Sequence, residues 1–212
     1  MPPPRLILAS SSPRRHQLMT EAGYQFESLA PHESVECGIC STGGPASLVV
    51  ELAMSKAVNV LAQLKERGDF DDRCVIIACD TVAECGGMVL GKPEDEAHAR
   101  SMLERLRGSL HRVYSGLCVW RPGVEGAAGE PDVRLATSEL TMDPITDAQL
   151  DEYLASGLWE GKAGAFGYQD RAGWLHLTKG SESNVVGLPM ELLTEMLARV
   201  DNASSAPGSA RG

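Results

Sequence analysis

The sequence predicts an α/β fold, because strand-like and helix-like segments alternate along its 212 residues. Residues 74–79 form an uninterrupted apolar run that ends at Asp80, as expected for a central strand buried on both faces. Residues 45–65 place apolar side chains close to every 3.6 positions, which predicts a long amphipathic helix. A chain of this length fits one sizeable domain, or two small lobes that share a sheet.

The first elements expected are a strand at 6–9 and a helix at 13–22. Pro13 has the fixed φ that suits a first helical turn, and Gly23 is a natural C-terminal cap. A second strand is expected at 24–29. A polar, glycine-rich loop then leads to the helix at 45–65.

The second half of the chain alternates in the same way. Gly86-Gly87 predicts a hairpin or tight return within 82–90. The further elements expected are a helix at 94–106, two long strands at 110–120 and 133–142 that suit an antiparallel arm, a helix at 147–155 and a last helix at 188–200. Residues 201–212 are rich in Ser, Ala, Gly and Pro, which predicts a disordered tail after a single domain at 1–200.

Composition indicates a soluble globular protein, with 43% hydrophobic and 23% charged residues. No apolar run reaches about 18 residues, and the N-terminus lacks the basic-then-apolar pattern of a signal peptide. We therefore expect a cytoplasmic protein without a membrane partner. The formal net charge of −10 argues against nucleic-acid binding, so a polyphosphate ligand would need a local basic pocket.

Six cysteines are too few for a secreted disulfide scaffold, so we expect them to be reduced. Cys37 and Cys40 form a lone Cys-x-x-Cys with His32 nearby. A structural zinc site would need two further ligands, and no second pair supplies them. We interpret the two as loop cysteines, with zinc or redox use as the alternative.

The segment Ser10-Ser11-Ser12-Pro13-Arg14-Arg15 follows the first strand and has the composition of a phosphate-binding turn. Hydroxyls and backbone N–H groups at a helix N-terminus favour an anion, and arginine can donate to two phosphate oxygens at once. The alternative is that Ser12 is an ordinary N-cap and that both arginines are solvated.

Lys56 and Asp80 are the next candidates. Lys56 lies among Ala53, Ala57 and Val60 on a face that we expect to be covered, where a lysine usually has a partner. The alternative for Lys56 is a solvated helix lysine. Asp80 follows a buried strand, where α/β sheets present ligand-binding residues, and its carboxylate can bind a metal or accept a proton from water. The alternative for Asp80 is a turn cap before Thr81.

Glycines punctuate the segment at 161–169 and allow close backbone approach to a ligand. Phe166 and Tyr168 alternate in a way that favours a strand with one packed face, and the alternative is a flexible loop. Further on, Asn184 is either a ligand contact or the N-cap of the last helix. We favour the structural role, because asparagine is a preferred cap.

Five motifs in this order resemble the Maf family of nucleoside triphosphate pyrophosphatases, from about residue 5 to about residue 197. They are Ser10 to Arg15, Ser55-Lys56-Ala57, Ala78-Cys79-Asp80-Thr81-Val82, Gly91-Lys92-Pro93 and the glycine-punctuated segment at 161–169. The resemblance implies a two-lobed α/β fold with a cleft between the lobes. It also implies hydrolysis of a nucleoside triphosphate to the monophosphate and pyrophosphate, and it suggests a homodimer.

The resemblance assigns roles to residues. Asp80 is the implied catalytic base. We place Lys56 and Lys92 in the catalytic set with Asp80, because a triphosphate needs positive charge where negative charge builds during the reaction. Together with Ser10, Ser12, Arg14 and Arg15 they would hold the triphosphate. A divalent cation, Mg²⁺ or Mn²⁺, is expected on Asp80 and a loop glutamate. We favour Glu36 for that second ligand, although Glu33 stays open because the local sequence matches the family only loosely.

Base selectivity is implied at Arg14, Thr81 and Gln169, which match the branch that acts on dTTP and UTP. Gln169 offers a donor and an acceptor to the edge of a uracil or thymine ring. A branch that acts on 7-methyl-GTP has tryptophan at the position of Arg14. Asp170 replaces the glycine usual in the family, so the sequence does not decide the conformation of the backbone turn at this position. The remaining alternative is a regulator of cell division that binds a nucleotide without cleaving it.

Overall fold

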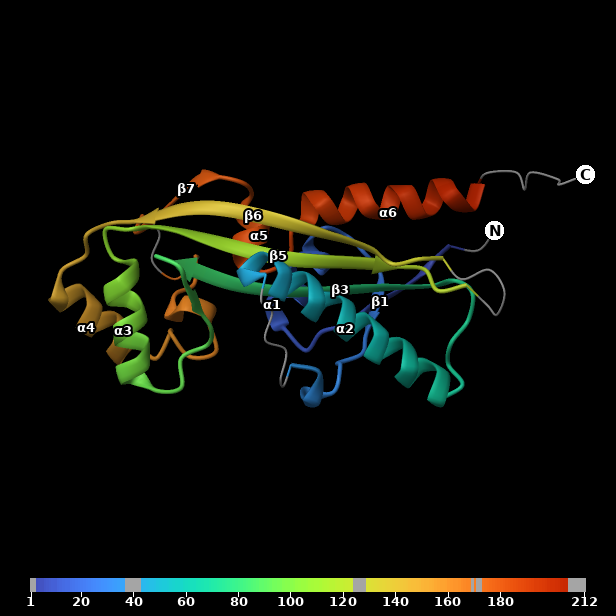
Figure 1. The fold of residues 1–212 in the computed structure, drawn as a ribbon, viewed down its shortest axis with the longest axis horizontal. Helices are drawn as coiled ribbons and strands as arrows, with labels where there is room; N and C mark the ends of the chain where they lie inside the picture. Colours follow the sequence, from blue (N-terminus) through green and yellow to red (C-terminus); the bar gives the residue numbers. More distant parts are fainter. Residues whose placement is uncertain (1–2, 37–42, 124–128, 169, 171–172, 206–212) are drawn as a thin grey trace, which may run out of the picture.

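The computed structural model describes residues 3–36, 43–123, 129–168, 170 and 173–205 (Figure 1). Its seven strands form one mixed sheet in the order β2-β1-β3-β5-β6-β7, with β4 paired to β3. The strands are β1 (Arg5–Leu8), β2 (Phe26–Ser28), β3 (Cys74–Cys85), β4 (Met88–Leu90), β5 (Leu110–Trp120), β6 (Asp132–Met142) and β7 (Leu175–Lys179). This arrangement confirms the predicted α/β class.

Helices flank this sheet on both faces and at both ends. The α-helices are α1 (Pro13–Glu21), α2 (Gly44–Glu66), α3 (Glu96–Leu106), α4 (Asp147–Ala155), α5 (Glu182–Val186) and α6 (Met190–Ser205), and the 3-10 turns are η1 (Glu33–Glu36) and η2 (Ala163–Ala165). The predicted helix and strand positions agree with these bounds to within a few residues, with the exceptions given below.

Strand β3 organises the molecule. It pairs in parallel with β1 and antiparallel with β5, and its first half is buried on both faces. The strand was expected to end at Asp80, but it runs on to Cys85 and forms the predicted hairpin with β4. The polar pair Asp80-Thr81 interrupts the apolar run without ending the strand, because β5 pairs with β3 along this whole stretch.

The core is divided between the two ends of the long strands. At one end, α2 packs on one face of the sheet and α1 with α6 on the other. At the other end, α3, α4 and η2 form a separate apolar cluster with β3, β5 and β6. Figure 1 shows α3 and α4 gathered at one end of the sheet and α6 at the other. These are the two lobes expected from the resemblance.

Helix α2 lies very close to the sheet. Gly116 of β5 meets its backbone, since a Cβ there would lie 2.1 Å from the Val49 carbonyl oxygen. Among the described residues, α2 is the one helix long and apolar enough to cross a membrane by length and composition. Half of that apolar stretch is buried in the protein, as in the core helix of a globular domain.

Three further predictions were wrong in detail. The segment with Phe166 and Tyr168 is not a strand, because it contains the turn η2 with Gly164 and Ala165 at positive φ. Asn184 is not the N-cap of the last helix. It lies inside α5, where its amide donates to the Val113 carbonyl and the Ser138 hydroxyl. Residues 201–205 belong to α6 and not to the predicted tail, and residues 206–212 lie outside the described residues.

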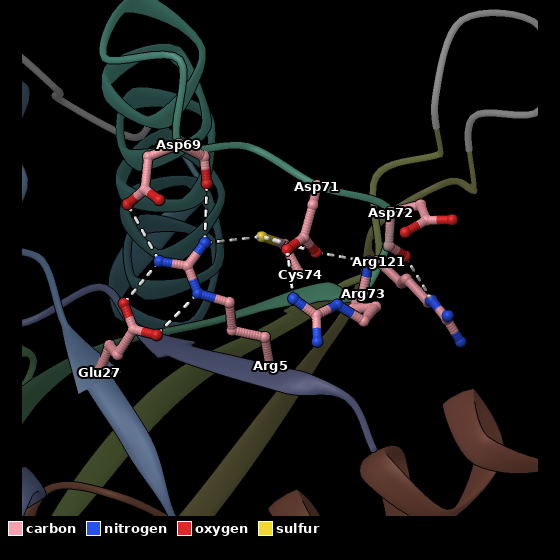
Figure 2. Close-up of polar contacts among 8 residues, drawn as sticks. All are labelled: Arg5, Glu27, Asp69, Asp71, Asp72, Arg73, Cys74 and Arg121. Carbon is pink, nitrogen blue, oxygen red and sulfur yellow. Dashed lines mark hydrogen bonds and ion pairs between the residues drawn. The ribbon is translucent and has the colours of Figure 1, made fainter. Parts of the chain in front are cut away.

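A polar network holds the start of β1, at the end of the strand remote from the serine-rich turn. Arg5 donates to both carboxylate oxygens of Glu27 at 2.7 and 2.6 Å, and to the carbonyl of Asp69 at 2.7 Å. Figure 2 shows this arginine between β2 and the loop that follows α2. Arg73 and Asp71 form a second, local pair beside it. The network joins β1, β2 and the α2–β3 loop.

Candidate functional site

A cavity of about 1020 Å³ lies at a gap along one edge of β3. On this edge β1 is paired as far as Ile77, and β4 pairs only from Ala83 onward. The residues between them, including Asp80 and Thr81, therefore have no neighbouring strand on this edge. Side chains from both lobes line the cavity.

Alternation along β3 decides which way Asp80 points. Ile76 and Ala78 pack towards α2, and Asp80 continues that series at a period of two. Its Oδ1 accepts a hydrogen bond from Lys56 Nζ at 2.6 Å, and the two side chains are only 13% and 5% exposed. The covered face predicted for Lys56 is therefore confirmed. A buried ion pair needs a structural or functional reason, because desolvation offsets much of its attraction.

The second Asp80 oxygen has no hydrogen-bond partner within the described parts of the chain. Since the carboxylate lines the cavity, that oxygen is available to a water molecule or a cation. Asp80 is not a turn cap, because it lies within a strand. The arrangement thus offers a general base held in position by an ammonium group.

Arg15 projects from α1 into the same cavity and is held by neutral groups. Its Nε donates to the Gly187 carbonyl at 2.8 Å, and its terminal nitrogens donate to the hydroxyls of Ser10 at 3.5 Å and Thr81 at 3.3 Å. No carboxylate in the described chain neutralises this guanidinium. Its positive charge therefore remains available for an anion.

Thr81 contributes to this arrangement through its hydroxyl. It lies 2.8 Å from the fully buried Ser115 hydroxyl and donates to the Gly187 carbonyl at 3.2 Å. Gly187 adopts φ +125°, a conformation that L side chains rarely take. Sequence reasoning missed Gly187, because its contribution is a backbone carbonyl that leaves no side-chain signal.

The serine-rich turn lies at the N-terminus of α1, as predicted. The Ser10 hydroxyl accepts from the Ser12 backbone N–H at 3.1 Å, and Ser12 occupies the N-cap position without making a side-chain cap bond. The alternative that Ser12 is an ordinary cap is therefore not supported. Arg14 is half-buried, lines the cavity and makes no ion pair with the described residues.

The other lobe supplies the opposite wall. Lys92 lies exposed on the loop after β4, and the preceding Gly91 carbonyl accepts from the Gly164 N–H at 3.0 Å. Apolar side chains line this part of the cavity, among them Val113, Met142, Phe166 and Leu175. One end of the cavity is thus cationic and the other apolar, as a nucleotide requires.

His111 also lines this apolar wall and was not identified from the sequence. Its side chain is 5% exposed, and its Nδ1 has no hydrogen-bond partner in the described structure. Burial lowers the pKa of the imidazole. A histidine near the start of an expected strand gives no indication of which face of the sheet its side chain takes.

Several predicted residues stand outside the described structure. Gln169 is one of them, as are Cys37 and Cys40, and the side chain of Glu36 is not described. Glu33, the alternative metal ligand, lines the cavity on the side of the serine-rich turn. Among the described residues, no group of three or more His, Cys, Asp or Glu side chains could hold a metal ion.

The described cysteines 74, 79, 85 and 118 are buried and free, as expected.

The sequence of this chain is similar to one protein family and to several known relatives. A family model described as Maf-like protein matches residues 5–200. A dTTP/UTP pyrophosphatase of Rhodopirellula baltica is 46% identical over 92% of this chain and 82% of its own length. A dTTP/UTP pyrophosphatase of Chelativorans sp. is 39% identical over 92% of this chain and 91% of its own length. A dTTP/UTP pyrophosphatase of Thermococcus gammatolerans is 34% identical over 90% of this chain and 94% of its own length.

Proposed function

Because the chain belongs to the Maf family, we propose that it hydrolyses dTTP and UTP to the monophosphate and pyrophosphate. The observation that carries the proposal is the position of Asp80. It lies in one cavity with three cationic side chains, those of Lys56, Arg15 and Lys92. The relatives named above are dTTP/UTP pyrophosphatases, which supports this substrate class.

Each described residue has a distinct part in this reaction. Water attacks the α-phosphorus, and Asp80 orients that water and accepts its proton through the oxygen that Lys56 leaves open. Arg15, Lys92 and the serine-rich turn bind the phosphates and offset the charge that develops on the leaving pyrophosphate. Arg14 lies in the same cavity, so that it can contact either the phosphates or the base.

We propose a divalent cation, Mg²⁺ or Mn²⁺, as the cofactor. Oxygen donors fit this ion: the open Asp80 oxygen and Glu33 both line the cavity, and Glu36 ends the same 3-10 turn. Mg²⁺ usually takes one or two protein carboxylates together with waters and phosphate oxygens, so one acidic residue from each segment is enough. When bound, the ion would supply charge neutralisation at the phosphate oxygens.

The test is a steady-state assay of pyrophosphate release with Mg²⁺ or Mn²⁺ across a panel of nucleotides. We expect release from dTTP and UTP, with slower turnover of purine and 7-methyl-GTP substrates. Failure to release pyrophosphate from either pyrimidine nucleotide would refute the proposal. Tight binding of dTTP without turnover would instead favour a nucleotide-responsive regulator.

We also propose a homodimer. The face between α2 and β6 carries exposed apolar side chains, with Val58 46% and Leu135 43% exposed. A shallow hollow beside them is lined by Val50, Met54, Pro131 and Val133 among others. Sedimentation should give a dimer mass, and Leu135→Lys should shift it towards the monomer. A wild-type protein that sediments as a monomer at micromolar concentration would refute this proposal.

A further inference from the structure

One carboxylate ties together the apolar wall of the cavity. Asp170 Oδ2 accepts from the Tyr153 hydroxyl at 2.9 Å and from the Gly167 N–H at 3.0 Å. The Lys162 ammonium pairs with the same oxygen. The ion pair is largely buried, at 13% exposure for Lys162 and 14% for Asp170. Three donors from three positions therefore converge on a single side chain.

The surrounding chain is built to admit this carboxylate. A Cβ at Gly167 would lie 2.5 Å from Asp170 Oδ2, so a larger residue there would push the carboxylate from its present position. Tyr153 is fully buried on α4. Its burial, and to a smaller extent its hydrogen bond to Asp170, raise the pKa of the phenol. Its hydroxyl thus remains a donor at any physiological pH.

The segment closed by Lys162 and Asp170 contains the strained part of the backbone. Gly164 has φ +70° and Ala165 has φ +60°, and Ala165 is the one non-glycine residue with positive φ in the described chain. Such a conformation costs about 1–3 kcal/mol and persists only where the surroundings enforce it. Gly164 in turn donates to the Gly91 carbonyl, next to Lys92.

We propose that Asp170 is a positioning residue for the nucleotide. By binding Lys162, Tyr153 and Gly167, it holds the strained turn η2 in place, so that the wall formed by Phe166 and Tyr168 keeps the shape that receives the nucleoside. This proposal rests on the function proposed above. Because the wall contacts the substrate before and during the reaction, its loss should raise KM more than it lowers kcat.

The experiment compares wild type with Asp170→Asn, which keeps the size of the side chain and removes its charge. We expect KM for dTTP to rise about tenfold, with kcat within about threefold. Amide hydrogen exchange over residues 162–168 should become faster, while exchange in β3 and β5 stays unchanged. The matched control is Asp151→Asn, which removes the exposed ion pair with Arg100 between α3 and α4.

A second variant separates positioning from stability. Asp170→Asn leaves the Lys162 ammonium buried without its partner, and Lys162→Met/Asp170→Asn removes that charge as well. We expect the double variant to recover thermal stability but not KM. Recovery of both would show that the KM effect followed from misfolding, and would overturn the proposal.

Two further outcomes would also overturn it. One is Asp170→Asn with wild-type KM and wild-type exchange, and the other is an equal KM change in Asp151→Asn. A wild-type protein that releases no pyrophosphate would refute the proposed function instead. In that case hydrogen exchange, with and without dTTP, still tests whether Asp170 holds the segment.

Discussion

At the scale of single residues, the Lys56–Asp80 pair has the strongest consequence for activity. Asp80→Asn keeps the shape of the side chain and can still accept a hydrogen bond from Lys56. It removes the charge that accepts a proton from water, so we expect kcat to fall by about 10²–10⁴-fold.

Binding of dTTP to Asp80→Asn should change much less, because Arg15, Lys92 and the serine-rich turn remain. Single-turnover kinetics and equilibrium binding measure the two effects separately. An Asp80→Asn enzyme with wild-type kcat would show that another group is the base. Glu160→Gln serves as the comparison, because Glu160 is an exposed carboxylate that lines the same cavity and has no proposed role in catalysis.

His111 gives a prediction on the pH dependence of stability. Burial lowers the pKa of its imidazole, opposed by the Ser109 carbonyl and the charge of Glu84. The folded state therefore prefers the neutral ring. The stabilisation is fully present above the unfolded pKa of about 6.5, and is lost as the pH falls below it.

Urea unfolding of wild type at pH 7.5 and pH 5.5 should show this loss. His111→Gln cannot gain a proton, so the difference between the two pH values should become smaller. If the variant retained the full wild-type difference, the loss would come from other groups.

At the scale of elements, the contact between α2 and β5 determines the geometry of the site. Gly116 pairs in register with Asp80 and lies against the backbone of α2. Gly116→Ala would force the helix away from the sheet, and we expect a loss of about 1–3 kcal/mol or more in the free energy of unfolding. Because α2 carries Lys56, kcat should also fall.

Chemical denaturation of Gly116→Ala and Gly91→Ala provides the comparison. A Cβ at Gly91 meets nothing within 4 Å, so Gly91→Ala should unfold close to wild type. Equal midpoints for the two variants would mean that α2 can shift at little cost. Strand and helix propensities cannot predict this contact, because Val49, which lies against Gly116, is some 67 positions away in the chain.

At the scale of the whole molecule, the two ends of β1 have separate roles. The serine-rich turn follows its carboxyl end, and the Arg5 network holds its amino end. The bond from Arg5 holds the pKa of the Glu27 carboxyl below its usual value. Arg5→Gln should therefore lower the free energy of unfolding by about 1–2 kcal/mol, without changing kcat or KM for dTTP.

Arg73→Gln is the matched control, since among the described residues Arg73 pairs with the nearby Asp71 alone, and it is more exposed than Arg5. We expect it to unfold close to wild type. A fall in activity on replacing Arg5, with stability unchanged, would contradict the separation of the two ends. Thermal unfolding and the pyrophosphate assay together decide this point.

The amino-acid sequence by itself determined the α/β class, most of the helices and strands, and most of the cationic set, but it gave no indication of β7 or α5. Buried strands, amphipathic helices and glycine stops are local patterns, and they can be recognised without the tertiary structure. The motifs around Arg15, Lys56, Asp80 and Lys92 are likewise short, and the structure brings all four residues to one cavity.

Only the tertiary structure decided how these residues meet. Asp80 reaches Lys56 because β5 extends β3 beyond the apolar run, and because Gly116 lets α2 lie close. The roles of Gly187 and Asp170 depend on a backbone carbonyl and on three donors that converge from separate segments. Contacts between distant segments have no local pattern, so they follow from packing and not from the order of residues.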